Sequence, residues 1–233
     1  MPPRAAAAAN PSASRQHRIK RPVSPSNCSA CEEPLTTPLG CHACGALEVV
    51  DDEPTPFAIF GRPVIWDIDQ AALKKDLLAL ARLCHPDFHG LANSARQQLA
   101  EQHSARVNHA HEVLARPFLR ADWIVTHLNG PSEKDERQMP QSFLMEVMEW
   151  NEQMEEADAT PAGSPEREAL KDLGDELDRE RAGHLESIGQ RLSPLPASGD
   201  ACLADLRREL NAVRYLSRAL WRIRELRLAE AEA

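Results

Sequence analysis

The stretch DQAALKKDLLALARLCHPDFHG, residues 69–90, decides how this chain folds. Its apolar residues recur at steps of four, three and four, which places them on one face of an α-helix. These residues are Leu73, Leu77, Leu80 and Cys84. Asp69 can cap the helix, because its carboxylate can accept hydrogen bonds from the free amides of the first turn. Pro86 ends the helix, since the residue before a proline is pushed out of the α region.

A second amphipathic stripe follows after a short loop and runs up to Pro117. Its members share one helical face: Leu99, His103, Val107, Ala110 and Leu114. Two stripes joined by a short connection predict an antiparallel helical hairpin. The tip of this hairpin presents the tripeptide His85-Pro86-Asp87.

The hairpin resembles the J domain of the DnaJ-type co-chaperones. The likeness is carried by His85-Pro86-Asp87 after a helix with three cations, which are Lys74, Lys75 and Arg82. The resemblance implies that the cations meet an acidic surface of a DnaK-type chaperone ATPase, and that the tripeptide engages the junction between that chaperone's ATPase and substrate domains. Asp87 offers a carboxylate that a partner arginine can bind as a fork. The simpler alternative is an ordinary turn, in which Pro86 breaks one helix and Asp87 caps the next.

Two further features resemble the J-domain variant of the HscB family. Phe57, Ile59 and Phe60 look like its short opening helix, although Pro56 stands where that family has an aromatic residue. Phe88 follows the tripeptide where general J domains often carry a basic residue. A helix from Phe118 to about Leu128, led by Pro117 at its first position, is expected to complete the domain.

Three more helices are expected at about 140–158, 165–192 and 200–231. Ser164-Pro165 indicates an N-cap followed by a proline in the first turn. Short connections make sequential helices antiparallel, so these segments predict an up-down three-helix bundle. Residues 129–139 contain Gly130, Pro131 and a charge run, and are expected to form a hinge in front of it.

The helix at 140–158 carries two apolar stripes. The first predicts a core face and consists of Phe143, Val147, Trp150 and Met154. The second lies on another side, next to two acids, and consists of Leu144, Met145 and Met148 with Glu149 and Glu152. One helix cannot bury both stripes in a small bundle, and an apolar stripe edged by acids is typical of an interaction surface. The alternative is that a neighbouring element covers it.

Phe143-Leu144-Met145-Glu146 and Arg214-Tyr215-Leu216 are similar to the C-terminal domain of HscB, the J-type co-chaperone of iron–sulfur cluster assembly. The likeness covers about residues 56–228. It implies that this surface holds an IscU-type scaffold. The matching positions are Leu144, Met145, Met148, Glu149, Glu152 and Tyr215.

Two cysteine pairs precede the J-like segment, Cys28-x-x-Cys31 and Cys41-x-x-Cys44. Two such pairs can supply four thiolates to one tetrahedral ion, so the spacing predicts a structural metal, with zinc first and iron as an open alternative. Gly40 and Gly45 are expected to supply φ > 0 positions. Disulfides are disfavoured, because nothing marks the chain as secreted, and free thiols remain the other interpretation. The module resembles the one at the front of longer HscB family members.

Composition limits the remaining functions. The chain of 233 residues is rich in Leu, Ala, Glu and Arg, which favours helices, and its net charge of -9 argues against general nucleic-acid binding. No apolar run is long enough for a membrane span. No phosphate loop or nucleophile elbow is present, so we expect neither an enzyme nor a bound nucleotide. Residues 1–27 are basic and free of acids, which suits a disordered tail in the bacterial cytoplasm or, alternatively, a transit peptide to the mitochondrial matrix.

Together these observations predict an all-α protein with a J-domain hairpin, a three-helix bundle and a small metal knuckle of four cysteines. The expected division is 1–27 (tail), 28–55 (metal module and linker), 56–129 (J domain) and 138–231 (scaffold-binding bundle). The resemblance implies a co-chaperone that brings an IscU-type scaffold to an HscA-like DnaK-family chaperone and stimulates its ATPase. The alternatives are a general J-protein for unfolded clients and a zinc-dependent enzyme or redox protein built around the cysteines.

Overall fold

The computed structural model describes residues 27–89, 94–139 and 141–231, so the expected tail falls outside it except for Asn27. The described part is helical, with no strand beyond two isolated β-bridges. The helices are α1 Pro56–Ile59, α2 Gln70–Cys84, the 3₁₀ turn η1 Pro86–Phe88, α3 Ser94–Ala115, α4 Pro117–His127, α5 Gln141–Ala159, α6 Pro165–Arg191 and α7 Cys202–Ala231. The all-α prediction is confirmed. None of these described helices combines the length and apolar character needed to cross a membrane.

The expected helix starts are built by the expected caps. The Asp69 carboxylate accepts from the amides of Ala71 and Ala72 at 2.8 and 3.1 Å. Ser164 Oγ accepts from the amide of Arg167 at 3.3 Å. Pro56 occupies the first turn of α1, which Thr55 caps through its hydroxyl. A proline is favourable there because the first amides of a helix have no partner within it.

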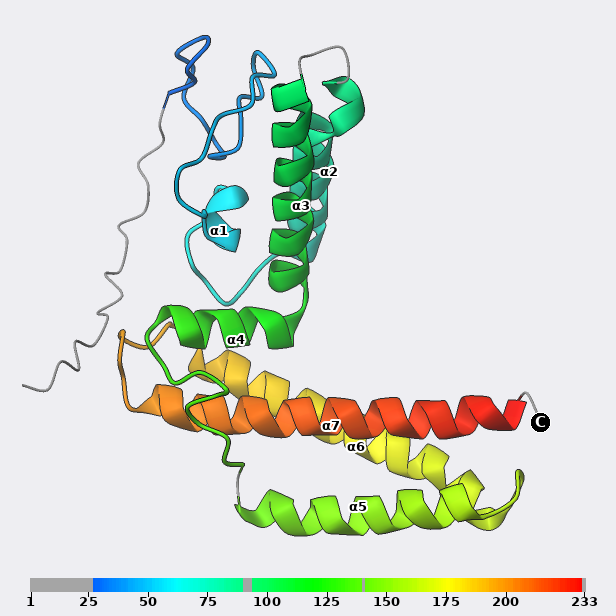
Figure 1. Ribbon diagram of the computed structural model, residues 1–233. Coiled ribbons are helices and arrows are strands. Elements are labelled where there is room, and N and C mark those ends of the chain that lie inside the picture. Colours follow the sequence, from blue (N-terminus) through cyan, green and yellow to red (C-terminus); the bar gives the residue numbers. More distant parts are fainter. Residues whose placement is uncertain (1–26, 90–93, 140, 232–233) are drawn as a thin grey trace, which may run out of the picture.

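The molecule is L-shaped (Figure 1). The hairpin of α2 and α3 forms one arm, with α1 and the cysteine module beside it, and α5, α6 and α7 form the other. Helix α4 lies at the corner and packs against α3, α6 and α7. The two arms of the L therefore carry the two surfaces that the sequence singles out, the tripeptide after α2 and the second stripe of α5.

One apolar core runs through the corner of the L. It holds the helices α1, α2, α3 and α4 together with the adjoining ends of α6 and α7. Its residues include Phe57, Leu114, Ile124, Ile188 and Leu206. A second core holds α5 against the other parts of α6 and α7, and includes the predicted stripe of Phe143, Val147, Trp150 and Met154. Since the first core is continuous from one arm into the other, apolar packing itself joins the arms.

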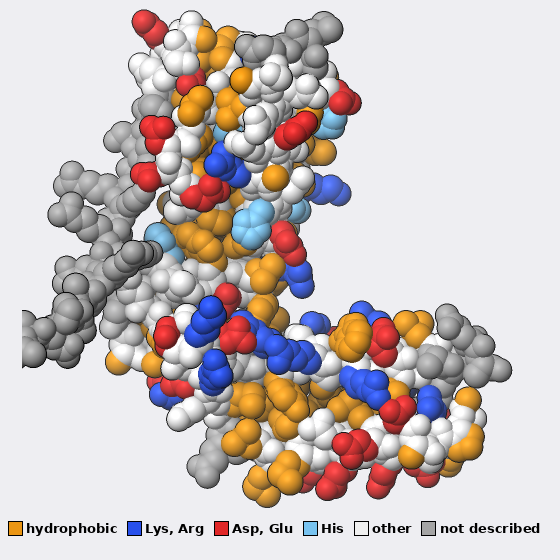
Figure 2. All heavy atoms as spheres, viewed as in Figure 1, with side chains coloured by type: hydrophobic (Ala, Val, Ile, Leu, Met, Phe, Trp, Pro, Cys, Tyr) orange, Lys and Arg blue, Asp and Glu red, His pale blue; other side chains and the backbone are white. Residues whose placement is uncertain are grey.

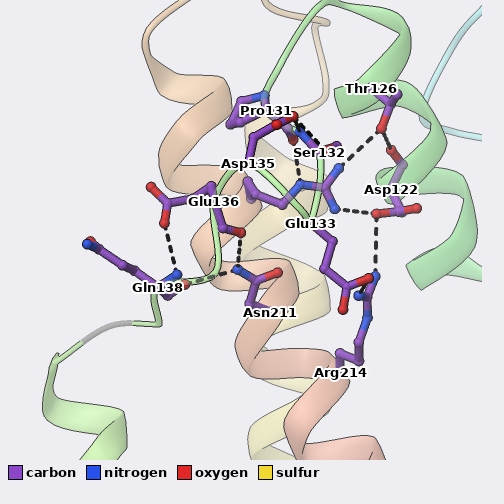
Figure 3. Close-up of polar contacts among 11 residues, drawn as sticks. Asp122, Thr126, Pro131, Ser132, Glu133, Asp135, Glu136, Gln138, Asn211 and Arg214 are labelled. Atoms are coloured by element: carbon purple, nitrogen blue, oxygen red, sulfur yellow. Dashed lines mark hydrogen bonds and ion pairs between the residues drawn. The ribbon is translucent and has the colours of Figure 1, made fainter.

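The segment 129–139 is fastened to the bundle rather than free to act as the expected hinge (Figure 3). Asn211 Nδ2 donates to the carbonyls of Glu136 and Gln138 at 2.9 and 3.0 Å. Arg207 Nε donates to the carbonyl of Pro131 at 2.7 Å. The sequence-based prediction missed this because its partners lie on α7, more than 70 residues away.

The cysteine module also docks on the hairpin. Leu39 is fully buried in the main core. His103 Nε2 lies 2.8 Å from the carbonyl oxygen of Glu48, and Arg106 holds the Glu53 carboxylate at 3.1–3.3 Å. The residues that the sequence suggested as a linker are irregular, but they are anchored along α3.

The corner of the L contains a tight helix-to-indole contact. A Cβ at Gly189 of α6 would lie 2.5 Å from Trp66 Nε1, and the Cζ of Arg120 in α4 lies 4.5 Å from the centroid of the same ring. Arg120 is itself tied to the carbonyl of Leu114 at 2.6 Å. The indole therefore contacts both α6 and α4, and its contact with α6 leaves no space for a side chain at Gly189.

We expect alanine at two glycines of α6 to have opposite effects. Gly183→Ala, with nothing within 4 Å of its Cβ, should raise the free energy of unfolding by about 1 kcal/mol through helix propensity. Gly189→Ala should lower it by about 1–2 kcal/mol, because overpacking against Trp66 outweighs that gain. Urea unfolding of the two variants provides the measurement. Equal stabilisation by both would show that the Trp66 contact is not tight.

Candidate functional site

The tripeptide lies in a defined turn at the exposed end of the hairpin. His85 follows α2 with φ −69° and ψ 129°, outside the α region as expected before a proline. The amide of Asp87 donates to His85 Nδ1 at 3.2 Å, and His89 Nε2 lies 2.9 Å from the buried carbonyl oxygen of Leu83. The side chains of His85 and Asp87 are 50% and 86% exposed. The turn is therefore anchored to the end of α2 through His89, while the side chains of His85 and Asp87 face solvent.

Asp87 does not cap the next helix, as the simpler interpretation of an ordinary turn requires. It lies inside the 3₁₀ turn Pro86–Phe88, whereas α3 begins at Ser94. Its carboxylate lies 3.6 Å from His85 Nδ1 and is otherwise exposed. The carboxylate is available to a cation from another molecule.

The three predicted cations all lie on the open face of α2. Lys74, Lys75 and Arg82 are all exposed. Two apolar side chains that the sequence-based prediction did not assign accompany them, Leu78 at 65% and Phe88 at 69% exposure. Leu78 could have been found from its register, since it lies three and four residues from the cations and off the buried stripe. The surface beside the tip is thus basic with an apolar centre.

The second stripe of α5 is exposed. Leu144, Met145 and Met148 are 47%, 72% and 66% exposed, and Glu149 and Glu152 beside them are exposed as well. The alternative that neighbouring helices cover this stripe does not hold. Tyr215 differs from the other predicted positions, because it is half-buried and its hydroxyl accepts from Asn151 of α5 at 3.1 Å. It joins α7 to the edge of the exposed stripe.

The four cysteines of the module converge on one point. Their sulfur atoms all lie within 4.8 Å of one another, with Cys28 and Cys41 buried and Cys31 and Cys44 exposed. Sulfur atoms are 3.6 Å apart between Cys28 and Cys44, and 3.7 Å between Cys31 and Cys41. A zinc ion with bonds of about 2.3 Å to four sulfurs requires tetrahedral edges of about 3.8 Å, and a disulfide requires about 2.05 Å. The residues fit a tetrahedral metal and no disulfide.

The two knuckles have the same backbone pattern. The amide of the first cysteine donates to the carbonyl five residues later, at 2.9 Å in Cys28–Glu33 and 2.8 Å in Cys41–Ala46. Each knuckle has one residue with a positive φ. It is Glu32 in the first knuckle, with φ of 62°, and Gly45 in the second, with φ of 75°. The expectation that Gly40 also needs φ > 0 is wrong. Gly40 is required for close packing instead, since a Cβ there would lie 2.7 Å from the carbonyl oxygen of Ala46.

Backbone amides already favour one thiolate. The amides of Cys44 and Ala43 hydrogen-bond the sulfur of Cys41, and they lower its pKa to about 7 despite its partial desolvation. For Cys31 the hydrogen bond from the Glu33 amide is outweighed by the neighbouring Cys44 sulfur and by desolvation, so its pKa rises to about 12. A divalent cation among the four sulfurs favours the thiolate form of each.

Comparisons with known proteins point to one family. Residues 139–224 match the family model described as the HSCB C-terminal oligomerisation domain. The Co-chaperone protein HscB homolog of Ralstonia nicotianae is 32% identical over 70% of this chain and 90% of its own length. That of Mannheimia succiniciproducens is 40% identical over 45% of this chain and 62% of its own length.

Solved structures show the same fold. Human co-chaperone protein HscB superposes with a TM-score of 0.67 at 23% identity, covering 85% of this chain and 96% of the human chain. Chaperone HscB from Vibrio cholerae gives a TM-score of 0.61 at 20% identity, covering 75% and 98%. The fold, the exposed tripeptide, the exposed α5 stripe and the extent of the Ralstonia match lead to one conclusion: this chain belongs to the HscB family of co-chaperones.

Proposed function

We propose that this protein is a co-chaperone of iron–sulfur cluster assembly. It binds an IscU-type scaffold through α5 and brings it to an HscA-like chaperone of the DnaK family, whose ATPase it stimulates. The observation that carries the proposal is that two exposed surfaces of different chemistry lie on the two arms of one molecule, whose main core runs from one arm into the other. A protein of this shape can hold a client and a chaperone at the same time.

The hairpin tip is suited to trigger the partner chaperone. The exposed Asp87 carboxylate can accept two hydrogen bonds from one arginine, a geometry that is stronger than a neutral contact. Lys74, Lys75 and Arg82 provide local positive charge on a chain whose net charge is -9, and this steers α2 toward an acidic surface. Leu78 adds an apolar contact in the middle of that face.

The α5 stripe is suited to hold a folded client. Leu144, Met145 and Met148 supply apolar area that is desolvated on docking, and the acids beside them form a polar rim. Methionine side chains also adapt to irregular partners, so the stripe is compatible with the second candidate, a general J-protein for unfolded clients. Suppression of aggregation without any preference for the scaffold would favour that second candidate.

The cysteine module is proposed to hold one structural zinc ion through Cys28, Cys31, Cys41 and Cys44. Zinc would stabilise the fold of a segment whose own apolar core is small. That core consists of Cys28, Leu35 and Cys41, with Ala46 packed against them. With four sulfur ligands the coordination shell is closed, so we propose no catalysis there.

We expect Asp87→Asn to abolish most of the stimulation of the chaperone ATPase, by about tenfold or more, because an amide cannot form the ionic fork with arginine. Scaffold binding should be unchanged. Steady-state ATP turnover of the chaperone with saturating scaffold provides the measurement, and Asp178→Asn, an exposed acid on α6, is the control. An unchanged stimulated rate in Asp87→Asn would refute the role given to the tip.

The double variant Leu144→Ala with Met148→Ala is expected to weaken scaffold binding by about 2 kcal/mol or more, as the truncation of interface anchors does. Titration calorimetry with the purified scaffold tests this. Leu228→Ala removes a similarly exposed side chain, at 55%, from the far end of α7, and it should bind normally. Equal affinity of the double variant and the control would remove α5 from the interface.

Metal analysis of the purified protein should find about one zinc ion per chain. Cys31→Ser should lose the metal, because a hydroxyl does not replace a thiolate ligand, whereas Cys202→Ser lies outside the module and should retain it. If the metal analysis finds iron in place of zinc, the four-sulfur site is right and the proposed identity of the ion is wrong. Full metal content in Cys31→Ser would contradict the four-sulfur site.

A further inference from the structure

A basic groove borders the α5 stripe and has no role in the function proposed so far. It is an open depression of about 420 Å³ between the segment 129–139 and α7. Its lining contains four cations and one carboxylate: Lys134, Arg137, Arg214 and Arg218, with Glu133. In Figure 2 the Lys and Arg side chains gather over α7, beside an apolar band, while Asp and Glu side chains line the outer side of α5.

The carboxylate of the groove is already engaged. Arg214 pairs with Glu133, lies 3.7 Å from Asp122, and places its guanidinium 5.4 Å from the centroid of the Phe118 ring. Arg214 is thus a fixed part of the wall (Figure 3). In the described part of the chain, by contrast, Arg137 and Arg218 are exposed and form no ion pair. The groove therefore has uncompensated positive charge at these two positions.

Asn211 lines the groove and fastens its two sides together. Asn211 is only 9% exposed, and its Nδ2 is used by two backbone carbonyls. Its Oδ1 has no hydrogen-bond donor among the described residues.

The groove is continuous with the proposed scaffold surface. Met139 and Tyr215 line it, and both pack against the core that holds α5. The Tyr215 ring lies 6.1 Å from that of Phe143, the neighbour of Leu144, and its hydroxyl is bonded to Asn151. A partner that covers Leu144 and Met148 therefore has the basic groove at its edge.

We infer that this groove binds an acidic segment of the same protein partner that docks on α5. The inference rests on the proposed scaffold-binding function and extends it to the chemistry of the partner. Two regions of opposite charge flank one apolar stripe, acids on α5 and cations in the groove. Such a surface accepts a partner in one orientation only, because the reversed orientation places like charges together. An extended nucleic acid is disfavoured, since the acids of α5 repel a second stretch of phosphates.

The test compares Arg137→Gln with Arg218→Gln, combined, against Arg224→Gln, an exposed arginine of α7 outside the groove. The probe is the purified IscU-type scaffold, titrated by calorimetry at low and at high sodium chloride. The double variant should bind about fivefold more weakly at low salt, as expected for two exposed ion pairs. Its affinity should also fall less steeply as salt increases, because screening has fewer charge pairs to weaken. Arg224→Gln should match the unmodified protein.

The outcomes separate the two proposals. If the α5 double variant loses affinity while the groove variant keeps both its affinity and its salt dependence, the groove inference is wrong and the scaffold function stands. If the scaffold fails to bind the unmodified protein, both are wrong. Two other results also overturn the inference: binding of a single-stranded oligonucleotide that depends on Arg137 and Arg218, or a dimer of this chain that the groove variant dissociates in sedimentation.

Discussion

The arrangement of the two arms depends on a charge placed inside the corner. Arg207 is 1% exposed, and its guanidinium pairs with Asp122 of α4 while it also donates to Thr126 Oγ1 at 3.2 Å and to the carbonyl of Pro131. Burying a charge carries a penalty of several kcal/mol that a single ion pair offsets poorly. Arg207 belongs to α7, and its guanidinium bonds both to α4 and to the segment that follows α4. The charge therefore fixes which faces of these elements meet, beyond what apolar packing specifies.

This constraint links the fold to the proposed activity. The tripeptide lies at the end of α2 and the exposed stripe lies on α5. One core joins the hairpin to the adjoining ends of α6 and α7, and a second core holds α5 against the same two helices. Trp66 contacts Gly189 of α6 and Arg120 of α4, and Ser193 Oγ donates to the Asp67 carboxylate at 2.7 Å. With these contacts a client bound to α5, as proposed, would keep a fixed orientation relative to the tip. A co-chaperone that presents a folded scaffold benefits from such rigidity, whereas a carrier of unfolded chains has less need of it.

Helix positions could be predicted from the sequence because their signals are local. The caps at Asp69 and Ser164, the break at Pro86 and the steps of three and four residues act within one or two turns, and each expected helix was found. The two stripes of α5 could be separated for the same reason, since the residue register alone assigns Phe143 and Leu144 to different faces. The spacing of the two Cys-x-x-Cys pairs is a local signal as well, because it is enough to predict four sulfur ligands around one ion.

The sequence by itself thus determined the helices, the converging sulfurs, the exposed tip and the second stripe of α5. Only the tertiary structure decided how these parts are joined. It fastened residues 129–139 where the pattern suggested a hinge, anchored the expected linker along α3, and placed Arg137 and Arg218 around one groove. The physical reason is sequence separation. Contacts such as Arg207–Pro131 and His103–Glu48 join residues 76 and 55 positions apart, and no periodicity or spacing in either segment encodes its partner.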